Sequence, residues 1–158
     1  MKKEKLLLQT AMTLLVFVAC PLSAAETIKY TGTVFGSPVK HLMPLGNGDA
    51  VLMIESSGIL ALSGNPPTLN TVTCSGMGYQ TTENKTTTDF YCNIKENDTD
   101  SLDLKGRAVE KGNESDGSFN VIGGSGKWKG ATGKGKFIRL EKSADTNKTF
   151  LEMEVTTP

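Results

Sequence analysis

Apolar and polar residues alternate along most of the chain after residue 25, and no run sustains the 3.6-residue period of a helix. At the C-terminal end, for example, Leu151, Met153 and Val155 alternate with acidic residues and a threonine. Such runs, rich in threonine, valine, isoleucine and aromatic residues and separated by glycine, asparagine and proline, are typical of β-strands. The pattern predicts strands at 27–35, 50–54, 59–62, 71–79, 87–95, 102–109, 118–122, 136–141 and 151–156.

The number and regular spacing of these strands predict a single all-β domain. Short antiparallel strands build either a sandwich or a barrel, and a barrel is favoured because closure leaves no exposed sheet edge. We therefore expect one antiparallel closed β-barrel of about eight strands. Turn residues at 36–38, 57–58 and 64–67 are expected to interrupt the sheet, and the polar tracts 93–101 and 112–117 to form loops.

The first 25 residues have the composition of a targeting segment. Three lysines precede an apolar run at 6–19, and small residues follow at 23–25. This order is typical of a bacterial-type secretory signal peptide, here cleaved before Glu26. The apolar run is shorter than the roughly 20 residues that span a bilayer, so a permanent anchor is the weaker interpretation. The sequence predicts a cleavable signal at 1–25 and a secreted or periplasmic domain at 26–158.

The three cysteines separate into one within the signal and two within the domain. Lipidation of Cys20 is the alternative to free release, but Phe17 and the proline after Cys20 fit a lipoprotein cleavage box poorly. Cleavage before residue 26 leaves Cys74 and Cys92, and an even pair in an exported protein favours a disulfide. A redox-active pair is the alternative, although the C-x-x-C spacing that activates a thiol is absent.

Charge and composition exclude several classes of function. The whole chain carries 17 basic and 17 acidic residues, and without the first 25 residues it carries 14 and 16, a net charge of −2. A nucleic-acid binder would normally show a basic excess, so nucleic acid is not an expected partner. The chain has one histidine and no cysteine–histidine cluster, which argues against a zinc enzyme. We therefore predict no metal and no cofactor.

A glycine-rich segment at 123–135 holds six glycines in thirteen positions. A phosphate-binding loop is considered first, but a glycine follows Lys134 where the Walker motif needs Ser or Thr, and the spacing also misses the dinucleotide fingerprint. Glycines instead suit tight corners of a strongly bent sheet. We expect Trp128 to pack over such a corner, with Lys127 and Lys129 pointing to solvent.

The stretch from Phe119 to Phe137, an apolar strand followed by Gly-Gly-Ser-Gly-Lys-Trp-Lys-Gly-Ala-Thr-Gly, resembles the signature of the allene oxide cyclase and dirigent-like barrel superfamily. The resemblance covers about 20 of the 133 residues after the signal, and Ser125 replaces the commoner threonine. It implies an eight-stranded barrel. Members bind hydrophobic small molecules inside the barrel, and some steer cyclisation or radical coupling without a cofactor. The family's catalytic residues lie outside this motif, so none is transferred to this chain.

Candidate catalytic groups are few. His41 is the only imidazole, and the Gly-x-Ser-x-Gly elbow of a serine hydrolase is absent, so a surface or rim position is favoured for it. Glu55 follows an apolar run and is considered as an acid or base in an apolar cavity, where burial would raise its pKa. A solvated charge at a strand end is the favoured interpretation of Glu55.

Four further residues are considered as ligand contacts. Arg107 and Arg139 lie within alternating strands and could pair with a ligand carboxylate inside the barrel, although outward, solvated positions are favoured. Tyr79 and Tyr91 could line a cavity, with core packing as the alternative.

Three functions follow from this pattern, and the sequence does not decide among them. The leading hypothesis is an exported barrel that binds a small hydrophobic or amphipathic molecule in its interior. The second is a cofactor-free cyclase or isomerase similar to allene oxide cyclase, with Glu55 as its acid or base. The third is a structural or interaction barrel packed by its own side chains, since small eight-stranded barrels are either filled or hold one ligand.

Overall fold

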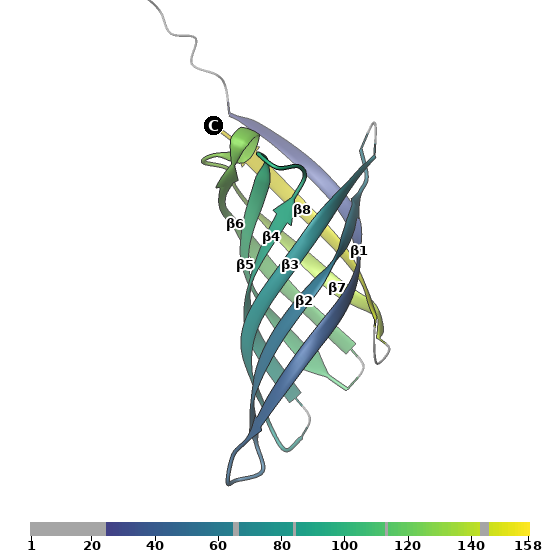
Figure 1. Cartoon of the computed structure of the whole chain (residues 1–158), viewed down its shortest axis with the longest axis vertical. Helices are drawn as coiled ribbons and strands as arrows, with labels where there is room; N and C mark the ends of the chain where they lie inside the picture. Colours follow the sequence, from purple (N-terminus) through teal and green to yellow (C-terminus); the bar gives the residue numbers. More distant parts are fainter. Residues whose placement is uncertain (1–24, 65–66, 84, 113, 143–145) are drawn as a thin grey trace, which may run out of the picture.

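A computed structural model of the chain describes residues 25–158, apart from 65–66, 84, 113 and 143–145. The predicted signal peptide, Cys20 included, lies outside the described residues except for Ala25. Eight antiparallel strands follow one another around a closed barrel, so the predicted fold class is confirmed (Figure 1). Its elements are β1 (Glu26–Pro44), β2 (Ala50–Leu62), β3 (Thr68–Gln80), β4 (Lys85–Lys95), β5 (Ser101–Lys111), β6 (Glu114–Ser125), η1 (Gly126–Trp128), β7 (Thr132–Lys142) and β8 (Asn147–Thr157).

The barrel core follows from the period-two alternation of the sequence. Every second side chain of a strand points to the same face, and the apolar set faces inward. No helix in the described part of the chain is long and apolar enough to cross a bilayer. The core consists of Leu60, Val72, Ile94, Leu102, Leu104, Phe119, Val121, Ala131, Leu151, Met153 and Val155.

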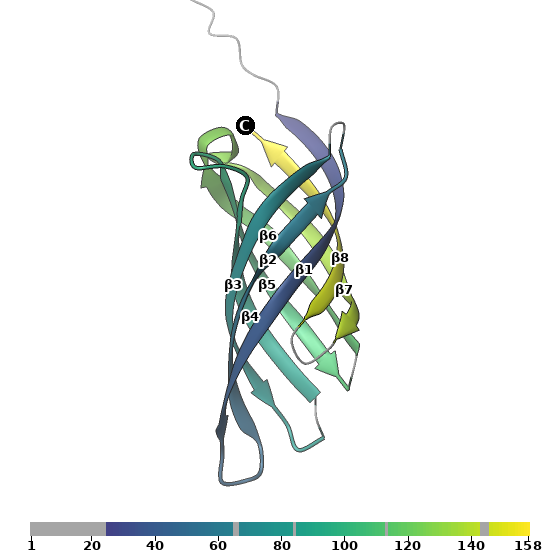
Figure 2. The ribbon, with the colours of Figure 1, turned by 45° about the vertical axis from the view of Figure 1, so that its right-hand side comes forward.

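The two ends of the barrel differ (Figure 2). The turns after β1, β3, β5 and β7 lie together at one end, which we call the hairpin end. The short helix η1, the β4–β5 loop and the C-terminus lie at the other, which we call the cap end. The strands are strongly tilted relative to the long axis, as closure of a barrel requires (Figures 1 and 2).

β2 is one continuous strand, whereas the sequence predicted a break at Ser57–Gly58. Gly58 pairs with Gly36 of β1, and a Cβ at position 58 would overlap the carbonyl oxygen of Phe35. Gly58 therefore allows the backbones of β1 and β2 to approach closely and does not form a turn. Because β2 is unbroken, its inward and outward positions keep one parity from Leu52 to Leu60.

β1 also runs further than predicted, passing through Pro38 to Pro44. Its pairing with β8 ends at Gly36, opposite Asn147, while its pairing with β2 continues to Pro44. Proline has no N–H to donate and is tolerated where one edge of a strand is free. The lower part of β1, residues 37–44, therefore pairs only with β2 and forms an open edge at the hairpin end.

Both predicted loops are shorter than expected. The tract 93–101 reduces to Glu96–Asp100, and the tract 112–117 reduces to a tight turn in which Gly112 has a φ of 62°. The other residues of these tracts belong to strands, where their backbones join the ladder; Asp116 is exposed, whereas Ser115 is buried.

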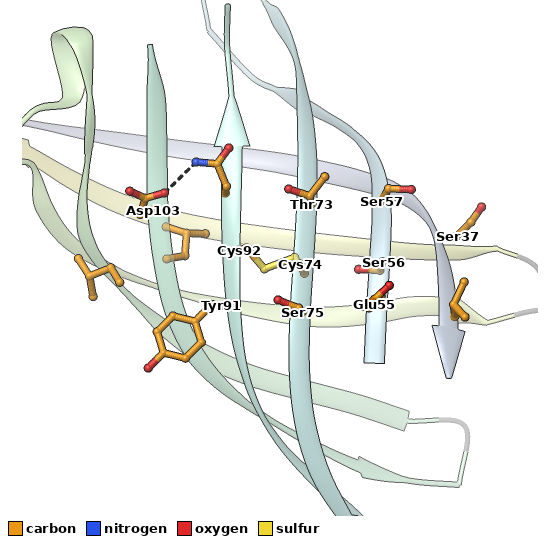
Figure 3. A pocket seen from close by; sticks show the side chains of 14 residues that line it. Ser37, Glu55, Ser56, Ser57, Thr73, Cys74, Ser75, Tyr91, Cys92 and Asp103 are labelled. Carbon is orange, nitrogen blue, oxygen red and sulfur yellow. Dashed lines mark hydrogen bonds between the residues drawn. A yellow bond between two sulfur atoms is a disulfide. The ribbon is translucent and has the colours of Figure 1, made fainter. Parts of the chain in front are cut away.

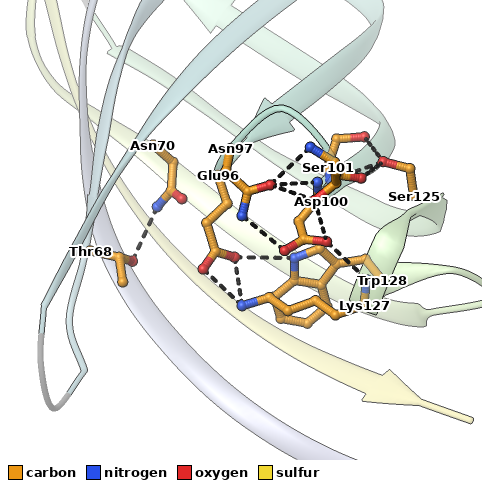
Figure 4. A network of polar contacts seen from close by, with 10 residues as sticks. Thr68, Asn70, Glu96, Asn97, Asp100, Ser101, Ser125, Lys127 and Trp128 are labelled. Carbon is orange, nitrogen blue, oxygen red and sulfur yellow. Dashed lines mark hydrogen bonds and ion pairs between the residues drawn. The ribbon is translucent and has the colours of Figure 1, made fainter.

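The glycine-rich motif forms the cap end, where its short helix meets the β4–β5 loop (Figure 4). Asp100 accepts hydrogen bonds from the Asn97 side chain at 2.9 Å and the Lys127 N–H at 3.1 Å, and these bonds lower the pKa of its carboxyl. Glu96 pairs with Lys127 at 2.7 Å and accepts the Trp128 Nε1–H at 3.4 Å. Trp128 packs against the core as expected, whereas Lys127 is engaged in this ion pair as well as being half exposed.

Cys74 and Cys92 form a disulfide, as predicted. They lie directly opposite each other in the β3–β4 ladder, with their Cα atoms 4.0 Å apart. Both pack against the barrel core. The bond therefore joins two neighbouring strands in the wall of the barrel.

Replacing Gly133 with alanine is expected to lower the free energy of unfolding by about 2 kcal/mol, because overpacking against rigid backbone is costly. The added Cβ would overlap the Glu154 carbonyl oxygen and lie 3.1 Å from the Cα of Val155. Urea unfolding measures the difference. Gly46→Ala is the matched control, since a Cβ there meets nothing within 4 Å. Equal effects of the two substitutions would contradict the close approach at Gly133.

Candidate functional site

A partly open cavity of about 170 Å³ lies in the barrel interior, with an apolar part and a polar part to its lining. Core side chains form the wall toward the cap end, where Phe90 and Phe137 meet edge to face with ring centroids 5.7 Å apart. Polar side chains line it toward the hairpin end, because the inward positions there hold polar residues. This polar part of the lining includes Thr88, Glu110, Arg139, Asn147 and Thr149.

Three charged side chains meet inside the barrel near the hairpin end. Glu110 accepts a hydrogen bond from Arg139 at 2.9 Å with one carboxylate oxygen, and its other oxygen lies 3.3 Å from Lys40 Nζ. The side chain of Glu110 is 8% exposed, that of Arg139 13% and that of Lys40 29%. They come from β5, β7 and β1, which are not neighbours in the barrel, so the ion pairs cross the interior. Such pairs are stronger than surface pairs because little water screens them.

Four buried polar atoms in the described part of the chain have no hydrogen-bond partner within the protein. They are Thr88 Oγ1, Ser115 Oγ, Arg139 Nε and Asn147 Oδ1. Buried polar atoms are normally satisfied, and each exception costs about 1–3 kcal/mol unless something else binds it. Thr88, Arg139 and Asn147 all line the cavity, and together they offer an N–H donor, a hydroxyl and a carbonyl acceptor. The cavity therefore combines an apolar wall with hydrogen-bonding capacity that the protein does not use.

Of the candidate catalytic and ligand-contact residues named from the sequence, Arg139 is the one that lines this cavity. Glu55 is exposed on the outer face of β2, so it does not point into an apolar interior. The reason is parity: the inward positions of the unbroken β2 are even-numbered. Arg107 is likewise on the outer face, where it bonds both carboxylate oxygens of Asp89 at 2.7 and 3.0 Å. This pairing lowers the pKa of Asp89 and raises that of Arg107.

Tyr79 and Tyr91 also lie on the outside of the barrel rather than in its cavity. The Tyr79 hydroxyl donates a short hydrogen bond to Asp49, which raises the pKa of the phenol and lowers that of the carboxyl. Lys105 Nζ lies 5.4 Å from the centre of the Tyr91 ring. Neither tyrosine can contact a molecule held inside the barrel.

Sequence reasoning missed Glu110, although a signal for it exists. Leu102, Leu104 and Ala108 form one face of the predicted strand, and the same parity extended by two residues places Glu110 on that buried face. An acidic residue that continues an apolar series is unusual unless it has a partner. Lys40 had no such signal, because the sequence predicted that β1 ended before it.

A second hollow, of about 630 Å³, lies on the outer wall over the disulfide (Figure 3). Polar residues of β1 to β5 line most of it, together with apolar side chains such as Val39, Tyr91 and Ile122. Asn93 donates to Asp103 at 2.8 Å there. The floor includes Cys74 and Cys92, so the disulfide separates this outer hollow from the interior cavity. No group of three or more His, Cys, Asp or Glu side chains in the described ranges could hold a metal ion. The interior cavity is the better candidate, because its polar atoms are buried and unsatisfied.

Comparisons with known proteins bear on the fold. No family model and no curated protein matches the chain. A solved structure, that of the pterocarpan synthase dirigent protein GePTS1, superposes with a TM-score of 0.57 and 11% sequence identity, covering 94% of this chain and 97% of that one. The likeness is one of fold. It supports the dirigent-like barrel fold that the glycine-rich motif implied, and the resemblance to allene oxide cyclase stays a prediction.

Proposed function

We propose that this chain is an exported barrel that binds one small amphipathic molecule in its interior. The observation that carries the proposal is the set of unsatisfied polar atoms at Thr88, Arg139 and Asn147, beside an apolar cavity wall. A ligand with an apolar body and a polar head would satisfy these atoms and fill the cavity. The similar fold of a dirigent protein agrees with a barrel that holds a small molecule.

The size of the cavity limits the ligand. At about 170 Å³ it is smaller than the 300–1,000 Å³ typical of drug-sized sites, and close to a cavity of about 150 Å³ that accepts benzene. We therefore infer a molecule of about one ring with a short polar substituent. Two of the three charged groups at the site, Lys40 and Arg139, are cations, which favours a carboxylate or another hydrogen-bond acceptor as the head.

Export is part of the same proposal. The signal pattern at 1–25 supports it, and so does the disulfide, since disulfides persist mainly in oxidising compartments. Release as a soluble protein after cleavage remains favoured over lipidation at Cys20.

A second candidate is a cofactor-free cyclase or isomerase related to allene oxide cyclase. The observation that favours it is a buried carboxylate, Glu110, that lines the cavity beside Arg139. Glu110 replaces Glu55 as the candidate acid or base, because Glu55 faces solvent. This function would require a substrate bound within reach of the Glu110 carboxylate.

Binding of benzoate tests the proposal, because this molecule has one ring and one carboxylate. Isothermal titration calorimetry should give one site per chain, and 1-pyrenecarboxylate should not bind because its ring system exceeds the cavity. Arg139→Gln is expected to raise the Kd of benzoate 10- to 100-fold, as loss of a hydrogen bond to a charged group predicts. Arg107→Gln, on the outer face, should leave the Kd unchanged.

A second variant tests binding independently of whether Arg139→Gln folds. Thr88→Val keeps the shape of the side chain and removes an unsatisfied hydroxyl, so it should weaken benzoate binding without lowering stability. If no probe binds to any variant, the interior is simply packed and the third function considered from the sequence replaces this one. Native mass spectrometry of protein purified from its own host would then identify, or fail to find, a retained molecule.

A further inference from the structure

The outer face of β1 to β3 carries a row of residues that neither the fold nor the cavity explains. In the strand register, His41 of β1 lies opposite Met53 of β2, and Met53 lies opposite Met77 of β3. Met43 is two positions further along β1, on the same face as His41. The row thus gathers the chain's only histidine with three of the four methionines between residues 26 and 158.

These methionines are exposed on the outer face of the barrel, as are several other large apolar side chains. Met43 is 62% exposed, Met53 49% and Met77 60%, whereas Met153 is buried in the core. One exposed apolar residue needs no explanation, because folded proteins leave much apolar area in solvent. Three thioethers beside the sole imidazole on adjacent strands are a chemically specific set.

The donor atoms of this set are soft. Thioether sulfur is polarisable and selects Cu(I) among biological metals, and imidazole nitrogen also binds copper. Hard cations such as Mg²⁺ and Ca²⁺ require oxygen ligands instead. The nearest carboxylate in the row, Asp89 opposite Met77, already bonds Arg107 through both oxygens. The soft donors of the row are therefore one nitrogen and two or three sulfurs, and Glu55, two positions from Met53 on the same face of β2, is a nearby hard oxygen donor.

We propose that His41, Met53 and Met77, with Met43 as a further ligand, form a surface site for a soft monovalent cation, Cu(I) or Ag(I). Neighbouring strands are about 4.8 Å apart, and directly opposite residues have Cβ atoms about 4.5–5.5 Å apart. The flexible methionine side chains can bring their sulfurs together above Met53, the middle residue of the row. His41 is itself exposed on this face, directly opposite Met53.

This site is separate from the interior cavity in both position and chemistry. The row lies on the outer wall, and none of its residues lines the cavity. A soft-cation site would therefore exist whether or not the barrel holds a small molecule, and the two proposals can fail independently.

Silver is the best first probe, because Ag(I) needs no reductant and leaves the disulfide intact. The protein, labelled with ¹³C in its methionine methyl groups, is titrated with silver nitrate in chloride-free buffer and followed by NMR. The signals of Met53, Met77 and Met43 should move and saturate at one equivalent of Ag(I). The signal of Met153, inside the barrel, should not move.

Affinity measurements identify the ligands. Met53→Leu and Met77→Leu should each raise the Kd for Ag(I) at least tenfold, and His41→Gln should raise it as well. Met153→Leu is the matched control: it removes a thioether with little change in volume and should leave the Kd unchanged. Cu(I), supplied in competition with bicinchoninate, should give the same order of variants, and excess Zn²⁺ should not displace Ag(I).

Two results would overturn the site. One is Ag(I) binding by Met53→Leu and Met77→Leu as tight as by the parent protein. The other is a shift of the Met153 signal in step with the other three, which would show unspecific binding to thioethers. Because leucine replaces methionine at exposed positions, neither variant should lose its fold, and the dispersion of the NMR spectrum checks this directly.

Discussion

Replacing Glu110 with leucine is expected to lower the free energy of unfolding by about 3–5 kcal/mol, the usual cost of removing one partner from a buried ion pair. The substitution leaves the Arg139 guanidinium, 13% exposed, inside the barrel without its carboxylate, and Lys40 loses a partner at 3.3 Å. Desolvated charge without a counter-charge is the source of the cost. Urea unfolding followed by circular dichroism measures the difference.

Two variants give this experiment its controls. Glu55→Leu removes a carboxylate from the outer face of β2, and its effect should stay within about 0.5 kcal/mol, as for other surface positions. Glu110→Leu combined with Arg139→Met should recover much of the lost stability, because apolar residues of similar volume often replace a buried pair at little cost. A double variant no more stable than Glu110→Leu alone would show that Arg139 stabilises the barrel in another way.

The contrast between Glu55 and Glu110 shows what sequence periodicity can and cannot locate. Alternation places strands correctly because burial of one face is a local property of each strand. It assigns a residue to the inside only if the strand is followed without interruption. For Glu55 the sequence favoured a solvated position, but the run Val51–Ile54 before it is apolar at every position and so does not show which face is buried, which left an inward Glu55 as the alternative. In β5 no break intervened, and the parity of Leu102 and Leu104 already pointed to Glu110.

The contact among Glu110, Arg139 and Lys40 could not be predicted from the sequence, because no local pattern specifies it. Lys40 and Glu110 are 70 residues apart in sequence, and Glu110 and Arg139 are 29 apart. They approach only because the sheet closes, and the stagger of strands around a closed barrel decides which inward residues face each other. The same holds at the cap end, where Lys127 meets Glu96 across 31 positions. The glycine-rich motif was recognisable from sequence, but its partner loop was not.

The interior cavity and the outer row also differ in how readily sequence reveals them. His41, Met53 and Met77 are far apart in the chain, and the register of β1 to β3 alone makes them neighbours. A one-residue shift in that register would turn a strand's side chains to the other face. Methionine at an alternating position is ordinarily taken as core, so exposure, which only the structure supplies, is what distinguishes these three from Met153.

Removing the disulfide is the second change with a large expected effect. Cys74→Ala combined with Cys92→Ala should lower the free energy of unfolding by about 3 kcal/mol, the loop-entropy value for a closed loop of this length. The two cysteines are 18 residues apart, and the bond restricts the unfolded chain more than it restrains the barrel, where the strand ladder already holds Cys74 opposite Cys92. For a domain of this size we expect the Tm to fall by roughly 10 °C.

Thermal unfolding with and without a reductant separates this entropic effect from lost packing. Reduction of the parent protein should lower its Tm by nearly as much as the double substitution does, whereas the double variant should not respond to reductant. If reduction leaves the parent Tm unchanged while the double variant is destabilised, the cost comes from the lost packing of the two half-buried side chains rather than from the cross-link. In that case the sulfurs act as packing atoms in the wall between the cavity and the outer hollow, and the bond contributes little to the stability of the barrel.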